Sequence, residues 1–260
     1  MNDESPGALV RQGRAVELLE GFLRRDLPPL HWGVREWSGL EGDVSGCTRE
    51  RELRAFLEPW ADHLEAPLVV ERDPKYIKAD VRAEWDDLDI DCGGWAPRQR
   101  FRFGRRGIEA APSPTGEEAA EIRRRQQQAA GLLRSFLRED LPALSWSLPI
   151  GGSPRASRRP LGTYDLAVSK VRRSLRGTFH TYEIEGRPRA EAIVRETFDR
   201  WGRFLGADVV ERRSSGTTFY EINVPGDEFD IGLWASLDLE EPSAAGERPH
   251  RPALLGLGEE

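Results

Sequence analysis

The chain contains one stretch of sequence twice. Residues 18–32 read LLEGFLRRDLPPLHW and residues 132–146 read LLRSFLREDLPALSW, with ten identical positions at an offset of 114. Further segments recur in the same order, pairing 39–42 with 174–177, 60–72 with 201–212, and 89–96 with 228–235. Because both order and identity hold, the pattern predicts an internal duplication, with one module over roughly 5–100 and a second over 116–240.

The alignment of the two copies pairs six of the eight tryptophans. The pairs are Trp32 with Trp146, Trp60 with Trp201, and Trp95 with Trp234. Large aromatic side chains supply much of the buried area of a small core. We therefore expect the two members of each pair to be buried in equivalent places.

Each module combines helical and strand patterns. Leu53, Leu57, Trp60 and Leu64 follow a helical spacing, and Pro59 within that stripe predicts a kinked or split helix. Short turns between the strand patterns favour an antiparallel sheet. The expected fold is α+β, with two tandem related modules. Each would be a two-layer sandwich of two helices on a four- to five-stranded antiparallel sheet, and the two would pack as a pseudo-two-fold intramolecular dimer that covers the open sheet faces.

Three connecting regions complete this organisation. Residues 101–115 form a linker between the modules, and the Pro- and Gly-rich residues 241–260 form a tail that we expect to be disordered. Seven residues separate Trp32 from Leu40, whereas 28 separate Trp146 from Leu175. The second module is therefore predicted to carry a 21-residue insertion near 147–173.

Composition and the absence of known motifs limit the classes of function that this chain can have. The chain has no run of apolar residues long enough to span a bilayer and no apolar signal segment at its start, and its two cysteines cannot form a disulfide framework. We expect a cytoplasmic protein without a membrane partner. No phosphate loop, GxGxxG, HExxH, GxSxG or CxxC motif is present, and no two histidines have metal-ligand spacing. These absences predict no cofactor and favour a non-enzymatic protein, although they leave an enzyme open.

Positive charge is concentrated in the middle of the chain. The formal net charge is -7, but residues 97–176 hold 17 bases and 7 acids. Arg-rich stretches over 97–106 and 155–173 supply the candidate anion-binding residues, namely Arg98, Arg100, Arg102, Arg105, Arg106, Arg155, Arg158, Arg159, Arg172 and Arg173. Such residues bind phosphates in nucleic-acid-binding proteins. The alternative interpretation is that they neutralise acidic module surfaces and flank an ordinary amphipathic strand.

Asp87, Asp89 and Asp91 form the only candidate metal site. Strand alternation would place the three carboxylates on one face, with Leu88 and Ile90 on the other. Oxygen ligands of this kind suit a divalent cation. The alternative is a solvated strand face whose charges discourage edge pairing.

Two resemblances bear on function. The motifs L-x-W-x-V (Leu30, Trp32, Val34), G-L-x-G-x-V-x-G (from Gly39 to Gly46) and F-x-x-W-A-x-x-L-x-A (Phe56/Leu57 to Ala66) resemble modules of uncharacterised actinobacterial α+β proteins. The element order is also similar to that of the type III secretion chaperone-like fold, whose members generally bind proteins and form dimers. The resemblances imply no catalytic activity and leave the oligomeric state open.

The leading hypothesis is a non-enzymatic macromolecule-binding protein, chaperone- or adaptor-like, whose partner is another protein. One alternative is nucleic-acid or polyanion binding through residues 97–106 and 155–173. A second alternative is an enzyme whose site lies in the cleft between the modules.

Overall fold

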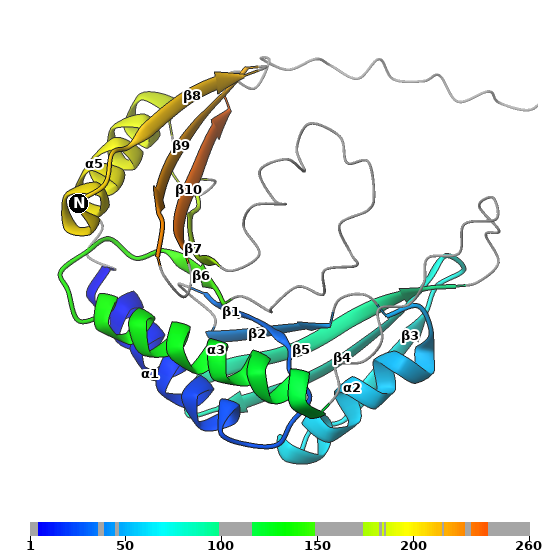
Figure 1. Cartoon of the computed structure of the whole chain (residues 1–260). Coiled ribbons are helices and arrows are strands. Elements are labelled where there is room, and N and C mark those ends of the chain that lie inside the picture. The colour runs from blue at the N-terminus through cyan, green and yellow to red at the C-terminus, as the bar shows by residue number, and fades with distance from the viewer. Residues whose placement is uncertain are drawn as a thin grey trace, which may run out of the picture.

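The protein folds as an α+β structure around one curved sheet. The computed structural model describes residues 5–35, 39–44, 47–98, 116–148, 174–181, 184, 186–214, 216–226 and 230–238. Within them the four helices lie on the convex side of the sheet, as Figure 1 shows. The elements are α1 (Ser5–Leu23), β1 (His31–Val34), β2 (Gly39–Val44), α2 (Glu50–His63), β3 (Leu68–Arg72), β4 (Tyr76–Trp85), β5 (Leu88–Pro97), α3 (Gly116–Phe136), β6 (Ser145–Ser147), β7 (Ser174–Phe179), α5 (Arg187–Leu205), β8 (Val210–Ser214), β9 (Thr217–Val224) and β10 (Asp230–Asp238).

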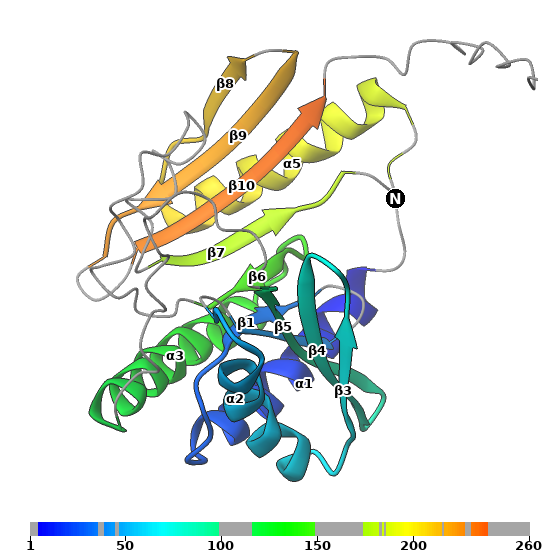
Figure 2. The same ribbon diagram turned by 90° about the vertical axis from the view of Figure 1, so that its right-hand side faces the viewer.

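The ten strands run in the order β3-β4-β5-β2-β1-β6-β7-β10-β9-β8. The first five strands come from residues 31–97, and together with α1 and α2 they are called the first half. The last five strands, together with α3 and α5, are called the second half. The halves meet where β1 pairs with β6 in antiparallel orientation, with Gly33 opposite Ser147. Figure 2 shows the two sets of strands one above the other, with α5 behind β9 and β10.

This edge-to-edge junction differs from the face-to-face packing expected from the sequence. Each half ends in a short strand, β1 or β6, whose backbone groups would otherwise lie unpaired at an edge. Pairing the two strands satisfies those groups and removes two sheet edges. As a consequence, the described helices cover only one face of the sheet, and the other face forms its concave side (Figure 1).

The sheet is mostly rather than wholly antiparallel. β2 pairs with β5 and β7 pairs with β10 in parallel orientation, and the remaining pairs are antiparallel. After β2 the chain crosses the sheet through α2 and returns by the hairpins β3–β4–β5, so β5 runs in the direction of β2. The α5 crossover has the same effect after β7. The expected antiparallel pairing is therefore confirmed for most of the sheet, and the two parallel pairings were not predicted because short turns reveal only hairpins, not crossovers.

Two of the tryptophan pairs lie in the core between helices and sheet. The ring centroids of Trp32 and Trp60 are 5.1 Å apart at 71°, and those of Trp146 and Trp201 are 5.4 Å apart at 68°. All four side chains are at most 2% exposed. Edge-on packing of this kind adds to the area buried by each ring.

The helix α2 runs without interruption through Pro59. The predicted split was wrong, since Glu50–His63 forms one helix whose Leu53, Leu57 and Trp60 side chains are buried. The free energy gained by burying this face offsets the loss of the backbone hydrogen bond that proline cannot donate.

Other predicted regions lie outside the described residues. They are the linker 101–115, the insertion near 147–173 except for its first two residues, and the tail 241–260. In the part of the chain that the structure describes, no helix has the length and apolar character needed to cross a bilayer.

Candidate functional site

The predicted row of three aspartates does not form. Asp86 and Asp87 make the two-residue turn between β4 and β5, and both have positive φ, 50° and 64°. The side chain of Asp87 forms an ion pair of 2.8 Å with Arg14 of α1, while the Asp86 carbonyl accepts a 2.7 Å hydrogen bond from the same guanidinium. The alternation of side chains between the two faces starts only at Leu88, where β5 begins. Asp87 therefore does not share a strand face with Asp89 and Asp91.

The other two aspartates lie on the concave face and do not form a metal site. Asp89 is exposed, and Asp91 forms a 3.3 Å ion pair with Arg82 of the neighbouring strand β4. Among the described residues, no group of three His, Cys, Asp or Glu side chains could hold a metal ion. This arrangement corresponds to the solvated strand face that the sequence left open as the alternative.

Of the ten candidate anion-binding arginines, only Arg98 falls within the described residues. It directly follows β5, where its backbone N–H donates to the Lys75 carbonyl and its guanidinium to the Asp73 carbonyl, at 2.9 and 3.2 Å. The contacts close the end of the hairpin. Arg100, Arg102, Arg105, Arg106, Arg155, Arg158, Arg159, Arg172 and Arg173 lie outside the described residues.

The concave face carries the third tryptophan pair. Trp95 is 63% exposed and Trp234 is 41% exposed. The expectation that this pair is buried was wrong. Trp95 follows Asp89, Asp91 and Gly93 in the period of two, so its side chain points away from the helices. That phase relation with two aspartates is a sequence signal that would have predicted an exposed side chain.

Each exposed tryptophan has an aromatic neighbour on the adjacent strand. Lys78 pairs with Trp95, and two positions earlier on β4 stands Tyr76, which is 44% exposed. Glu221 pairs with Trp234, and two positions earlier on β9 stands Phe219, whose ring centroid lies 6.2 Å from that of Trp234. Each half therefore has an aromatic pair on its concave face, but the second pair is shifted by two residues along the sheet, because Trp234 pairs with Thr178 of β7 whereas Gly93, two residues before Trp95, pairs with Asp43 of β2.

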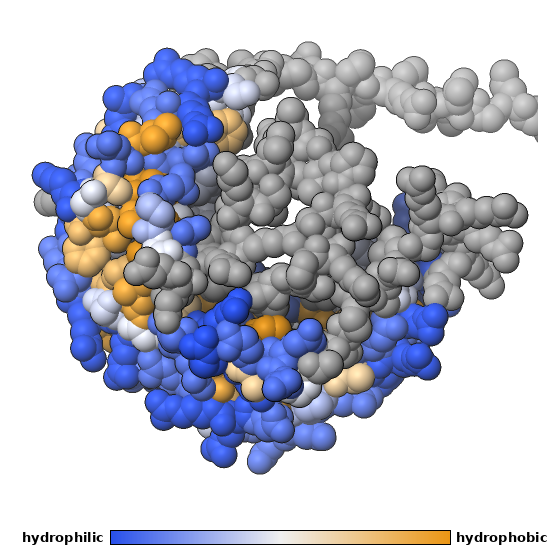
Figure 3. Space-filling model, in the orientation of Figure 1, coloured by the Kyte–Doolittle hydropathy of each residue, from blue (hydrophilic) through white to orange (hydrophobic). Residues whose placement is uncertain are grey.

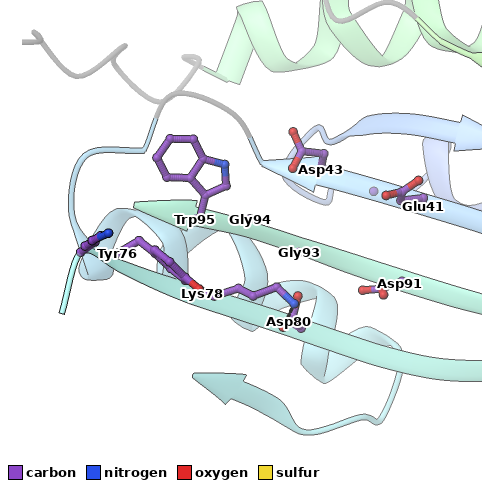
Figure 4. Close-up of a pocket in the computed structure, with 11 residues that line it drawn as sticks. Glu41, Asp43, Tyr76, Lys78, Asp80, Asp91, Gly93, Gly94 and Trp95 are labelled. Carbon is purple, nitrogen blue, oxygen red and sulfur yellow. Dashed lines mark ion pairs between the residues drawn. The ribbon is translucent and has the colours of Figure 1, made fainter. Parts of the chain in front are cut away.

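A pocket of about 620 Å³ lies beside Trp95. Figure 4 shows Trp95 standing on β5, with side chains of β2 on one side and of β4 on the other. Its lining residues are Glu41, Gly42, Asp43, Lys75, Tyr76, Lys78, Asp80, Asp91, Gly93, Gly94 and Trp95. The sequence analysis had selected only Asp91 from this group as a site residue. The lining residues of β2 and β4 were missed because these strands reach β5 only through a parallel pairing and a hairpin.

Most charges at the pocket are paired. The Lys78 ammonium lies 2.9 Å from Asp80, Asp91 pairs with Arg82, and Glu41 accepts hydrogen bonds from Arg35. Loss of water around Asp91 raises the pKa of its carboxyl group, against the opposing effect of Arg82. Loss of water also raises the pKa of Asp43, although part of this side chain remains exposed.

The junction of the halves brings together two residues that the sequence did not link. His31 Nε2 on β1 lies 2.7 Å from the Ser147 hydroxyl on β6. Burial lowers the pKa of His31, although Asp43 on the next strand opposes the shift. Asp43 accepts no hydrogen bond from His31, so this dyad lacks the orienting carboxylate of a hydrolytic triad.

The two cysteines are poor nucleophiles in the folded chain. Burial raises the pKa of Cys47 to about 11 and that of Cys92 to about 12. Both thiols are therefore protonated at neutral pH, and the thiolate is the reactive form. They pack as small apolar side chains in the core.

Comparisons with known proteins found no match to this chain, whether against protein-family models, curated proteins or solved structures.

Proposed function

We propose that this chain is a non-enzymatic binding protein, chaperone- or adaptor-like, that holds a polypeptide on its concave sheet face. The observation that carries the proposal is an aromatic pair on the concave face of each half, Tyr76 with Trp95 and the half-buried Phe219 with Trp234, on strands that no described helix covers. Exposed tryptophan and tyrosine side chains are enriched in protein-binding surfaces.

The proposal includes a duplicated origin and a pseudo-two-fold relation between the halves. The strand order supports it, since reading outward from the β1–β6 junction gives the corresponding strands in the same order on both sides. The core supports it as well, because Trp60 Nε1 donates to the Pro28 carbonyl at 2.9 Å and Trp201 Nε1 donates to the Pro142 carbonyl at 3.1 Å. These two donors and two acceptors are aligned in the repeated sequence.

The charge on the concave face favours a polypeptide over a nucleic acid. In the first half, strand alternation directs seven carboxylates and only three cations to this face. A surface with this balance repels phosphate groups. The acids are Glu41, Asp43, Glu71, Asp80, Glu84, Asp89 and Asp91, and the cations are Arg35, Lys78 and Arg82.

Selection from a phage-displayed library of random linear peptides tests the function. Peptides selected on the full chain would be synthesised, and their affinity measured by fluorescence anisotropy with wild type, Trp95→Ala, Trp234→Ala and the control Val10→Ala. Val10 lies on α1, on the convex side, and is 65% exposed, close to the exposure of Trp95.

We expect each tryptophan variant to lose about tenfold in affinity, in keeping with the loss of an aromatic anchor, and Val10→Ala to bind as wild type. The proposal would be wrong if no peptide were selected. It would also be wrong if the peptides bound all four proteins equally, or if a single-stranded oligonucleotide bound more tightly than any peptide.

The outer surface offers a weaker alternative for binding. Hydrophilic residues dominate the visible convex side in Figure 3, and apolar residues gather mainly over the half that holds α5. On α5, Phe204 is 41% exposed, whereas Val210 pairs with Glu221 and therefore lies on the concave face with Trp234. We place the binding function on the concave side because both halves present an exposed tryptophan there.

A further inference from the structure

We propose that the pocket beside Trp95 binds an arginine side chain of the polypeptide on the concave face. The inference rests on the proposed function, since it specifies which side chain the first half selects. The geometry of the pocket, its aromatic wall and a carboxylate that has no ion-pair partner among the described residues each support this ligand.

At Gly93 the floor of the pocket is covered by the Asp80 carboxylate. A Cβ atom at this position would lie 2.6 Å from Asp80 Oδ1 and 3.3 Å from the Ala79 carbonyl oxygen, so a side chain cannot be accommodated without displacing Asp80. Asp43 of β2 is the strand neighbour of Gly93 on one side, and Asp80 of β4 is its neighbour on the other. Glycine at this position makes room for the Asp80 carboxylate, which lines the channel between β2 and β4.

One wall of this channel is aromatic. Trp95 lies two residues beyond Gly93 on the same face of β5, and Tyr76 flanks it on β4. A guanidinium group stacks on an indole ring through its planar face and through cation–π attraction. Strand spacings place Trp95 and Asp43 roughly 8 Å apart at Cβ, a distance that an arginine side chain can bridge.

The unpaired carboxylate is Asp43. Among the described residues it has no ion-pair partner, whereas Glu41, Asp80 and Asp91 each have one. The charged or titratable groups that act on it are His31 on β1 and Glu41 on its own strand. The exposed Lys75 also lines the pocket, but it lies in the β3–β4 turn roughly 16 Å along the strand direction from Asp43, where salt screens it.

The hydration of the Asp43 carboxylate also favours a guanidinium ligand. The carboxyl group of Asp43 has a raised pKa because the surrounding wall removes water from it. A carboxylate that has already lost part of its water gives up less hydration when a cation binds. A guanidinium is also the less strongly hydrated of the two cationic side chains, and it can donate two hydrogen bonds to one carboxylate.

The second half lacks this chemistry. Thr178 and Arg176 on β7 stand where the first half has Asp43 and Glu41, and in this register Trp234 takes the place of Gly93 and Glu221 that of Asp80. Loss of water lowers the pKa of the Arg176 guanidinium, and a second cation beside it would meet like-charge repulsion. We therefore expect the second half to accept an uncharged segment, so the two halves give the bound chain a direction.

Two labelled peptides of alternating glycine and arginine or glycine and citrulline test the inference. Citrulline keeps the shape of arginine and removes its charge. Binding to the full chain would be measured by fluorescence anisotropy for wild type, Asp43→Asn, Trp95→Ala and Glu58→Gln. Glu58 is a charge-matched control, since it lies on α2 and its side chain is 57% exposed.

We expect the arginine peptide to bind and the citrulline peptide to bind at least about tenfold more weakly. Asp43→Asn and Trp95→Ala should each lower affinity for the arginine peptide about tenfold, whereas Glu58→Gln should change it less than twofold. Affinity should fall on acidification as Asp43 becomes protonated, and the Asp43→Asn variant should lose that part of the pH dependence.

Equal binding of the citrulline peptide would overturn the inference, as would equal effects of Asp43→Asn and Glu58→Gln. If the arginine peptide fails while library-selected peptides still bind in a Trp95-dependent manner, the arginine pocket is wrong and the proposed function stands. If the selected peptides also ignore Trp95, the proposed function fails with it.

Discussion

Gln126 occupies on α3 the position that Gln12 occupies on α1, and each side chain donates its hydrogen bond into the opposite half. Gln12 Nε2 lies 2.6 Å from the Leu144 carbonyl oxygen, and Gln126 Nε2 lies 2.8 Å from the Leu30 carbonyl oxygen. Both glutamines are fully buried. The exchange ties the helix of each half to the first strand region of the other, so the β1–β6 junction does not hold the halves together alone.

Replacing either glutamine by methionine should destabilise the chain. The change Gln12→Met or Gln126→Met leaves a buried carbonyl without its donor, which costs about 1–3 kcal/mol of unfolding free energy. We expect a loss near the lower end of this range. Each glutamine also buries an Oε1 atom that has no hydrogen-bond partner among the described residues, and methionine removes this unsatisfied atom. Urea unfolding measures the loss.

The half-buried Gln127, which donates to the Leu23 carbonyl at 2.9 Å, provides the control for this change. Gln127→Met should cost less than about 0.5 kcal/mol because water can replace the donor there. A loss at Gln12 no larger than the loss at Gln127 would show that the crossed hydrogen bonds do not stabilise the pairing of the halves.

The sequence predicted the α+β class because helical and strand periods are both clear along the chain. The stripe of Leu53, Leu57 and Trp60 lies buried on α2 as expected, and Gly206 ends α5 with a φ of 63°. Pairing between distant strands was not predictable in the same way. The parallel contact of β2 with β5 and the junction of β1 with β6 depend on crossovers and edges, which local periodicity does not encode.

The buried tryptophans offer a direct comparison between the halves. Trp60→Phe and Trp201→Phe each remove one indole hydrogen bond, to Pro28 and to Pro142, and each leave a small cavity. Both should lower unfolding free energy by about 1–3 kcal/mol, and the two losses should agree within about 1 kcal/mol.

Calorimetry or urea unfolding would provide the measurement, with Trp95→Phe as the control, because that side chain is mostly exposed. A loss in one half several times that in the other would contradict equivalent surroundings, and with them the duplicated origin that we propose.

Only part of the candidate site could be predicted from the sequence. Asp91 was selected as a possible metal ligand and does line the pocket, but it pairs with Arg82. Asp43 and Tyr76 carry no local motif, and the strand pairings alone bring them to Trp95. Trp95 itself was noticed as a repeated residue and assigned to the core, since repetition indicates importance without indicating which face a side chain occupies.

The Asp86–Asp87 turn should respond to substitution through its backbone. Asp87 has a φ of 64°, which a non-glycine residue adopts at a cost of about 1 kcal/mol or more, although aspartate tolerates it better than most. Asp87→Gly and Asp87→Ala both lose the ion pair to Arg14, so the difference between them isolates the backbone effect. Asp87→Gly should be more stable than Asp87→Ala by about 1 kcal/mol in urea unfolding. Equal stability of the two variants would mean that the turn relaxes to negative φ.

His31 should make the junction of the halves sensitive to acid. Burial lowers the pKa of His31 in the folded chain below its ordinary value of 6.5, while Asp43 and Glu41 act in the opposite direction and Arg176 and Arg35 in the same direction. The unfolded chain therefore binds a proton more readily than the folded chain. The stabilising contribution is complete above pH 6.5 and is lost as pH falls from there through the lowered folded value.

The variant His31→Gln separates this effect from other titrating groups. Glutamine keeps a polar partner for the Ser147 hydroxyl and does not titrate in this range. Unfolding free energies measured by urea titration between pH 5 and 8 should fall more steeply toward acid for the wild type than for the variant. Parallel curves would show that His31 keeps its ordinary pKa, and a steeper curve for the variant would reverse the sign of the linkage, so that protonation of His31 would strengthen rather than weaken the contact between β1 and β6.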